Sequence, residues 1–265
     1  NEIIAKNIIG LDPTKQNQID QILINLDGTA NKSKLGANAI LSVSMAACEL
    51  GAAVSSLQTY EYLVVKYNLV KLAKERLPIP MFNLINGGKH GAGNLDFQEF
   101  HIIPSSQLPL NKCIEIGDTV YQNLKSLLIK KKAIHSVGDE GGFAPNLFNN
   151  VDAVELLLEA VQSTNFKFNQ DVFIGIDIAA NSFYQGGKYQ IRDRAESYSA
   201  EEFIHYLVEL KKQYNILSIE DPLQEDDWSH WAAITSEIGQ DNMIIVDDLL
   251  VTNKKSLEKS ITQHA

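Results

Sequence analysis

Carboxylates lie at the ends of three apolar runs in this 265-residue chain. VFIGID ends at Asp177, ILSIED ends at Glu220 and Asp221, and MIIVDD ends at Asp247 and Asp248. If these runs are strands of one β/α architecture, their carboxyl ends converge on one face, so residues distant in sequence become neighbours. Side chains alternate along a strand, so one residue of each run is selected: Asp177, Glu220 and Asp247.

Three carboxylates gathered without a cation repel one another, and some of them take up protons. Hard oxygen ligands of this kind suit Mg²⁺, so the pattern predicts a magnesium site formed by Asp177, Glu220 and Asp247. The alternative is that acidic residues at strand ends merely cap the following helices or solvate loops.

Two glycine-rich segments carry the other candidate groups. In SVGDEGGFAP, glycines flank Asp139 and Glu140 and a proline follows, which predicts a shaped loop that is neither helix nor strand. The segment INGGKHGAGNLDFQEF supplies His90, Gln98 and Glu99. Taken alone, His90 is better explained as a hydrogen-bonded structural histidine, and the acidic loop is equally well explained as an ordinary turn.

The elements that must position these groups fall into two regions. Residues 1–76 read as helical, with a helix predicted from Asp12 and Pro13 to Asp27 and Gly28. A second helix is predicted over GANAILSVSMAACELG. Small and apolar residues occupy nearly every face of this helix, so it is predicted to be buried. In residues 77–265, short apolar runs alternate with helical patterns, which indicates β/α units and a largely parallel sheet.

The number of strands leaves the architecture of residues 77–265 open. The strand-like runs are PMFNLI, FQEFHII, VFIGID, ILSIED and MIIVDD. A closed (β/α)₈ barrel needs eight strands, so a barrel would be unfinished. An open doubly wound sheet accommodates the same runs.

Composition narrows the class of protein. The net charge of −10 disfavours a nucleic-acid partner, and two cysteines make a disulfide framework unexpected and buried free thiols the better interpretation. We expect no membrane insertion, because we find no run of about 18 apolar residues, and no signal peptide. These features predict a cytoplasmic protein.

Six segments closely resemble enolases, in particular bacterial ones, in the order in which that family carries them: LGANAILSVSMA, NLINGGKH, SVGDEGGFAPN, IGIDIAA, SIEDPLQEDDW and VDDLLVTN. The resemblance implies an α/β fold, with a partial enolase-type TIM-like barrel in residues 77–265. The helical part of an α+β N-terminal domain precedes it in residues 1–76. The resemblance also implies a lyase of glycolysis that interconverts 2-phosphoglycerate and phosphoenolpyruvate with Mg²⁺. It further implies that the protein forms a homodimer.

The resemblance also assigns roles residue by residue. Asp177, Glu220 and Asp247 match the family's metal ligands, and Glu140 matches the acid that helps hydroxide to leave. Glu99 matches a second acidic residue near the departing hydroxyl. His90 and Gln98 match positions on the substrate side, and Asp139 is expected to support the loop.

The resemblance leaves out one essential group. The family's proton-abstracting lysine would follow residue 265, and Lys254, Lys255 and Lys259 do not match it. We therefore expect an internal piece of an enolase that lacks both ends and catalyses poorly or not at all by itself, the full-length parent being the active form.

Three alternatives remain at this point. Another dehydratase or a racemase of the same superfamily would use a similar metal triad. A binding or surface-adhesion module would keep the fold without catalysis. By resemblance alone, a cell-surface or secreted pool is a location to consider beside the cytoplasm.

Overall fold

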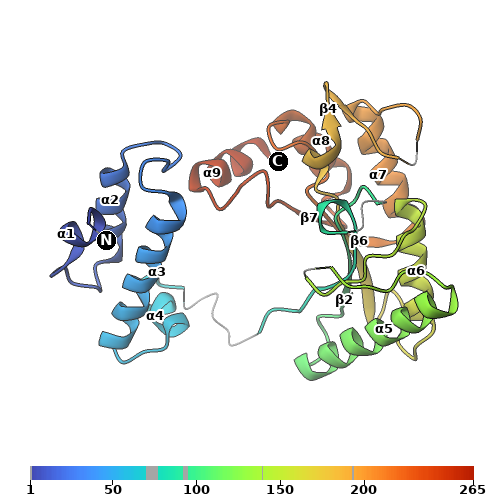
Figure 1. Ribbon diagram of the computed structural model, residues 1–265, viewed down its shortest axis with the longest axis horizontal. Coiled ribbons are helices and arrows are strands. Elements are labelled where there is room, and N and C mark those ends of the chain that lie inside the picture. Colours follow the sequence, from blue (N-terminus) through green and yellow to red (C-terminus); the bar gives the residue numbers. More distant parts are fainter. Residues whose placement is uncertain (1, 70–76, 92–94, 139, 193) are drawn as a thin grey trace. The chain divides into compact units, whose positions relative to one another are not determined.

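The chain divides into two compact units, Asn1–Leu77 and Pro78–Ala265. A computed structural model describes residues 2–69, 77–91, 95–138, 140–192 and 194–265 (Figure 1). The division lies one residue from the boundary expected from the sequence.

The first unit is helical, as its sequence predicts. It contains α1 (Ile4–Ile8), α2 (Gln16–Asp27), α3 (Ala37–Val54) and α4 (Thr59–Lys66). Helix α2 ends where Gly28 adopts a left-handed conformation with φ of 70°, which glycine adopts without a steric cost. It begins later than predicted, because Asp12 accepts hydrogen bonds from the backbone N–H and the hydroxyl of Thr14 and forms a turn there.

Helix α3 differs from expectation in two ways. Helices α2 and α4 pack against it, yet only Ile40, Gly51 and Ala52 are buried, so the predicted burial is wrong. Its 18 residues have a mean hydropathy of 1.5, so by length and composition it is able to cross a membrane, against the expectation that no such run exists. One such helix is weak evidence, because core helices of soluble proteins pass the same test.

The second unit contains a five-stranded sheet in the order β1-β2-β3-β6-β7. All five strand-like runs of the sequence form these strands. Their bounds are β1 (Phe82–Asn86), β2 (Glu99–Pro104), β3 (Val172–Asp177), β6 (Ile216–Glu220) and β7 (Met243–Ile245). The helices are α5 (Leu110–Lys130), α6 (Asn150–Gln162), α7 (Ala200–Tyr214), α8 (Trp228–Ile238) and α9 (Lys254–Gln263). Short elements complete the unit: η1 (Gly88–His90), η2 (Ala180–Phe183) and the hairpin of β4 (Tyr184–Gln185) and β5 (Lys188–Tyr189).

The expectation of a largely parallel sheet is wrong for its first half. Strand β2 is antiparallel to both β1 and β3, whereas β3, β6 and β7 are parallel. Residues 87–98, which include η1, join β1 to β2, and the chain reverses direction between these two antiparallel strands. Consequently β2 begins at the edge of the sheet where the other four strands end.

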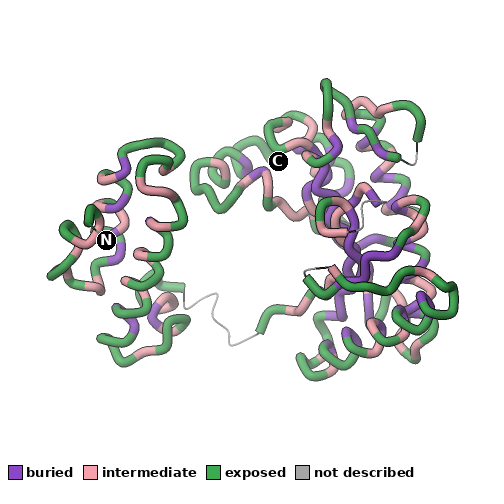
Figure 2. The backbone as a smooth tube through the Cα atoms, viewed as in Figure 1, coloured by how far each residue is buried: buried purple, intermediate pink, exposed green. Residues whose placement is uncertain are grey.

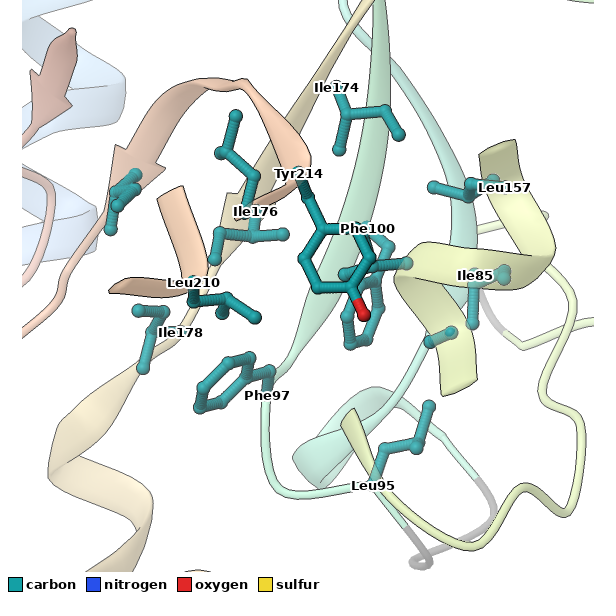
Figure 3. Packing of buried hydrophobic residues seen from close by; sticks show 14 of the residues in the cluster. Ile85, Leu95, Phe97, Phe100, Leu157, Ile174, Ile176, Ile178, Leu210 and Tyr214 are labelled. Carbon is teal, nitrogen blue, oxygen red and sulfur yellow. The ribbon is translucent and has the colours of Figure 1, made fainter. Parts of the chain in front are cut away.

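One face of the sheet is apolar and packs against helices. Phe100 and Ile102 of β2 and Ile174 and Ile176 of β3 belong to the same buried cluster as residues of α5, α6 and α7. Figure 3 shows Phe100, Ile174 and Ile176 beside Leu157 of α6 and Leu210 of α7. Buried backbone is concentrated in these strands (Figure 2), so this core fixes the position of the strand ends.

Helix α7 begins with the capping box that its sequence predicts. The backbone N–H of Glu202 donates to the Ser199 hydroxyl at 3.2 Å, and the N–H of Ser199 donates to the Glu202 carboxylate at 2.8 Å. Two donors that the first helical turn leaves unpaired are thereby satisfied.

Ser199→Ala is expected to lower the free energy of unfolding by about 1 kcal/mol, because it removes the cap acceptor. Chemical denaturation measures the loss. The control is Ser126→Ala, since the Ser126 hydroxyl donates only to Gln122 of its own helix. Equal stability of the two variants would contradict the role of the cap.

Candidate functional site

A row of polar residues crosses the sheet at the edge where β2 begins and its neighbours end. Asn86 pairs with Glu99, Glu99 with Asp177, and Asp177 with Glu220. Residues paired across strands point to the same face, so these four side chains lie on one face, opposite the apolar core. We call this row the acidic edge.

Glu99 belongs to a cluster with His90 and Glu140. The His90 Nδ1 atom lies 3.1 Å from Glu99 Oε1 and 3.3 Å from Glu140 Oε2. Asn83 donates from Nδ2 to Glu140 Oε2 at 3.3 Å. The cluster thus joins residues from β1, η1, β2 and the glycine-rich loop.

The loop of residues 136–145, which carries Glu140, reaches the acidic edge because its backbone pairs with β1. Phe143 donates its N–H to Leu84 and accepts the N–H of Asn86, both at 2.8 Å. At Gly142, a Cβ atom would lie only 1.9 Å from Asn86 Oδ1 and 3.1 Å from Asn83 Oδ1. A larger residue would have to displace the buried Asn86 side chain, so glycine is favoured at this position.

The strand-end carboxylates form two groups that share Asp221. One ligand atom from each of Asp177, Glu220 and Asp221 lies within 4.8 Å of the others, and the same holds for Asp221, Asp247 and Asp248. The sequence predicts only one inward-pointing residue from Glu220 and Asp221 and one from Asp247 and Asp248. That expectation is wrong, because both members of each pair contribute to these groups. Asp221 follows the end of β6 with φ of 41°, so strand alternation no longer applies to it.

A small pocket of about 170 Å³ lies between these carboxylates and Gln98. Gln98 donates from Nε2 to Asp177 Oδ2 at 3.2 Å. Lys89, Asp221 and Asp247 also line the pocket. The pocket offers mostly oxygen atoms, together with one exposed ammonium group.

Family models identify both units of the chain. The model "Enolase, C-terminal TIM barrel domain" matches residues 74–265, and the model "Enolase, N-terminal domain" matches residues 1–63. The chain belongs to the enolase family. The five-stranded sheet with its covering helices is therefore part of an enolase-type TIM barrel, as the resemblance implies, and not an open doubly wound sheet.

The structure brings together most of the residues predicted for an enolase site. Glu140, Glu99 and His90 form one cluster, and Gln98 touches Asp177. Asp177 and Glu220 are neighbours at the acidic edge. Asp247 instead groups with Asp221 and Asp248, so the predicted triad is not one compact group among the described residues. Asp139 lies outside the described residues, and its predicted support of the loop stays a prediction.

Burial and mutual repulsion disfavour charge on the strand-end carboxylates. Burial, followed by the charge of Glu220, raises the pKa of Asp177 from 3.8 to about 8. Burial raises the pKa of Asp221 to about 6 and also raises the pKa of Glu220. A cation bound among these groups would relieve both penalties.

The pair Glu99 and Glu140 divides its charge unequally. The hydrogen bond from His101 is the largest cause that lowers the pKa of Glu99 to about 2. The hydrogen bond with the charged Glu99, more than burial, raises the pKa of Glu140. Glu99 therefore carries the negative charge, whereas Glu140 holds a proton more strongly than an ordinary glutamate.

The donor set at the acidic edge fits a hard divalent cation. Every candidate ligand at the strand ends is a carboxylate oxygen, which is the donor that Mg²⁺ prefers. Asp177 and Asp221 are 7% and 4% exposed, so an approaching ion would be partly removed from water. Residues of this enolase-family chain thus suit the metal that the resemblance implies.

Three contributors to the site were missed from the sequence. Asp221 accepts the backbone N–H groups of Asp247 and Asp248, both at 3.0 Å, and so ties β6 to the loop after β7. Asn181 donates to Asp248 at 3.0 Å. His101 lies on the face of Glu99 because it follows it by two positions, and that spacing was the signal available in the sequence.

Gly142→Ala is expected to lower the free energy of unfolding by about 1 to 3 kcal/mol, because the new methyl group clashes with Asn86. Gly186→Ala is the control, since its Cβ would meet no atom within 4 Å and only its φ of 59° is strained. Denaturation curves compare the two. A loss at residue 142 no larger than that at residue 186 would contradict the close packing of the loop on β1.

In metal-free protein, stability is expected to fall as the pH rises from about 4 to about 8. The pKa of Asp177 is raised to about 8, so between its ordinary and raised pKa values the folded state binds a proton that the unfolded state has released. That stabilisation is complete below about pH 4 and is lost as the pH rises through about 8.

Asp177→Asn is expected to reduce this slope and to stabilise metal-free protein at about pH 9 by about 1 to 3 kcal/mol. Thermal melts in chelator at three pH values measure the effect, with the exposed Asp118→Asn as the matched control. If Asp177→Asn and Asp118→Asn gave the same pH dependence, charge on Asp177 would not destabilise the fold.

Proposed function

We propose that this chain carries the acid and the metal ligands of an enolase, a hydro-lyase that reversibly converts 2-phosphoglycerate into phosphoenolpyruvate with Mg²⁺. Family membership supports the enzyme class. The observation that carries the specific reaction is the juxtaposition of Glu140, a carboxyl whose pKa is raised, with a metal-type carboxylate group at the same edge of the sheet. Elimination of water needs both an acid for the leaving hydroxyl and concentrated positive charge.

Glu140 is the proposed general acid. Its pKa is raised chiefly by the hydrogen bond with Glu99, so it holds its proton more strongly than an ordinary glutamate. Glu140 is half exposed, with 47% of its side chain open to solvent, so a substrate hydroxyl can reach it. Asn83 and the packing of Gly142 against β1 hold it in place.

Glu99, His90 and Gln98 are the proposed neighbours of the substrate. Glu99 stays charged and accepts the hydrogen bond that keeps the proton on Glu140. His90 contacts both glutamates, and its imidazole is partly exposed, so a substrate is able to reach it. Gln98 orients the Asp177 carboxylate through its amide.

Asp177, Glu220 and Asp247 are the proposed ligands of Mg²⁺, with Asp221 holding the loop that carries Asp247. When bound, the cation stabilises the negative charge that develops on the substrate carboxylate as its neighbouring proton is removed. The protein's own contribution is to fix Asp177 and Glu220 at the ends of β3 and β6, with Asp177 buried, whereas Asp247 is exposed in the loop after β7.

Purified protein, expressed as its gene encodes it, is expected to form phosphoenolpyruvate from 2-phosphoglycerate and to lose that activity with chelator. Glu140→Gln is expected to lower kcat by about 100-fold or more, because the amide has no proton to donate at neutral pH. The control is Glu237→Gln, an exposed glutamate of α8. The rise in absorbance of the product measures both rates, and wild-type kcat in Glu140→Gln would sink the assignment of the acid.

Magnesium is expected to raise the melting temperature more at about pH 8 than at about pH 5, since protons compete with the ion for the same carboxylates. Asp177→Asn should abolish this shift, whereas Asp118→Asn should preserve it. A magnesium shift that persists in Asp177→Asn would place the ion elsewhere.

A further inference from the structure

Two histidines hold Glu99, one at each carboxylate oxygen. His90 Nδ1 lies 3.1 Å from Oε1, and His101 Nε2 lies 2.8 Å from Oε2. An ionised carboxylate only accepts hydrogen bonds, so Nε2 of His101 carries the proton of the shorter contact. The two oxygens of Glu99 are thus directed to different partners.

The two histidines differ in how firmly the fold holds them. His90 is part of η1 and 36% of its side chain is exposed, whereas the figure for His101 is 8%. His101 sits inside β2, flanked in register by Asn83 of β1 and Gly175 of β3. A buried side chain on a central strand keeps its orientation, whereas an exposed one on a loop is free to move.

Residues of the neighbouring strands shape the space around His101. Gly175 has no side chain, and a Cβ there would meet the Ser218 hydroxyl at 2.2 Å and Ile103 at 3.0 Å. Neighbouring groups therefore already fill the place of a side chain beside the imidazole. Among the described residues, the His101 imidazole hydrogen-bonds Glu99 and no other group.

We propose that His101 is a positioning residue of this site, which holds Glu99 Oε2 so that Oε1 remains directed toward His90 and Glu140. This inference rests on the proposed function, in which Glu99 works beside the departing hydroxyl. His101 itself does not touch the reacting atoms.

His101→Met removes the donor and keeps an unbranched side chain of similar bulk, whereas His101→Gln keeps an N–H donor. We expect His101→Met to lower kcat for 2-phosphoglycerate dehydration by about 10-fold to 100-fold, with KM within about twofold, since a hydrogen bond to a charged group is lost while substrate binding is kept. His101→Gln should recover most of kcat. His135→Met, at an exposed histidine, is the matched control.

Wild-type kcat in His101→Met would overturn the proposal, and so would a His101→Gln variant as impaired as His101→Met. Equal losses in the two variants would indicate that the ring serves packing alone. Melting curves of each variant accompany the kinetics, so a folding defect is recognised as such.

A second measurement depends on neither activity nor variants of His101. In ¹⁵N-edited spectra of the wild-type protein, the His101 Nε2–H proton is expected far downfield and slow to exchange, and Glu99→Gln should move it upfield. An unchanged resonance would overturn the proposal. If the wild-type protein failed to dehydrate 2-phosphoglycerate while this signature persisted, the proposed function would fall and the hold of His101 on Glu99 would stand.

Discussion

The crowding of carboxylates at one edge of a sheet is the constraint on which the rest of this structure depends. Burial and like charge both oppose ionisation of Asp177, Glu220 and Asp221, so isolated protein pays a penalty for gathering them. The apolar face of the same strands, packed on α5, α6 and α7, keeps the strand ends in register and so maintains the arrangement. A site that is unfavourable without a cation is thereby prepared to bind one.

The acidic edge also separates two kinds of carboxyl chemistry within a short distance. Around Glu99, histidine donors stabilise negative charge, and this charge in turn keeps a proton on Glu140. Around Asp177, the principal partners are other carboxylates, so the local demand is for positive charge. The reversal of β2 creates this division, because it brings the start of one strand to the ends of its neighbours.

Local rules account well for the elements of the fold. All five strands follow apolar runs, the capping box of Ser199 and Glu202 marks the start of α7, and Gly28 ends α2. These signals act within a few residues and need no tertiary contact. Where the sequence was misread, tertiary structure decided the direction of β2 and the exposure of α3, whereas the later start of α2 follows from the local turn of Asp12 and Thr14.

The sequence by itself determined the residue types of the site, the shaped loop and, through its motifs, the enolase family. Only the tertiary structure decided which carboxylates meet, because strand register joins residues 99, 177 and 220, and a left-handed Asp221 breaks the alternation that the sequence implies. It also decided that Glu140, 41 positions beyond Glu99 in the chain, shares hydrogen bonds with Glu99 and His90. Such contacts depend on packing between segments far apart in sequence, which no local pattern specifies.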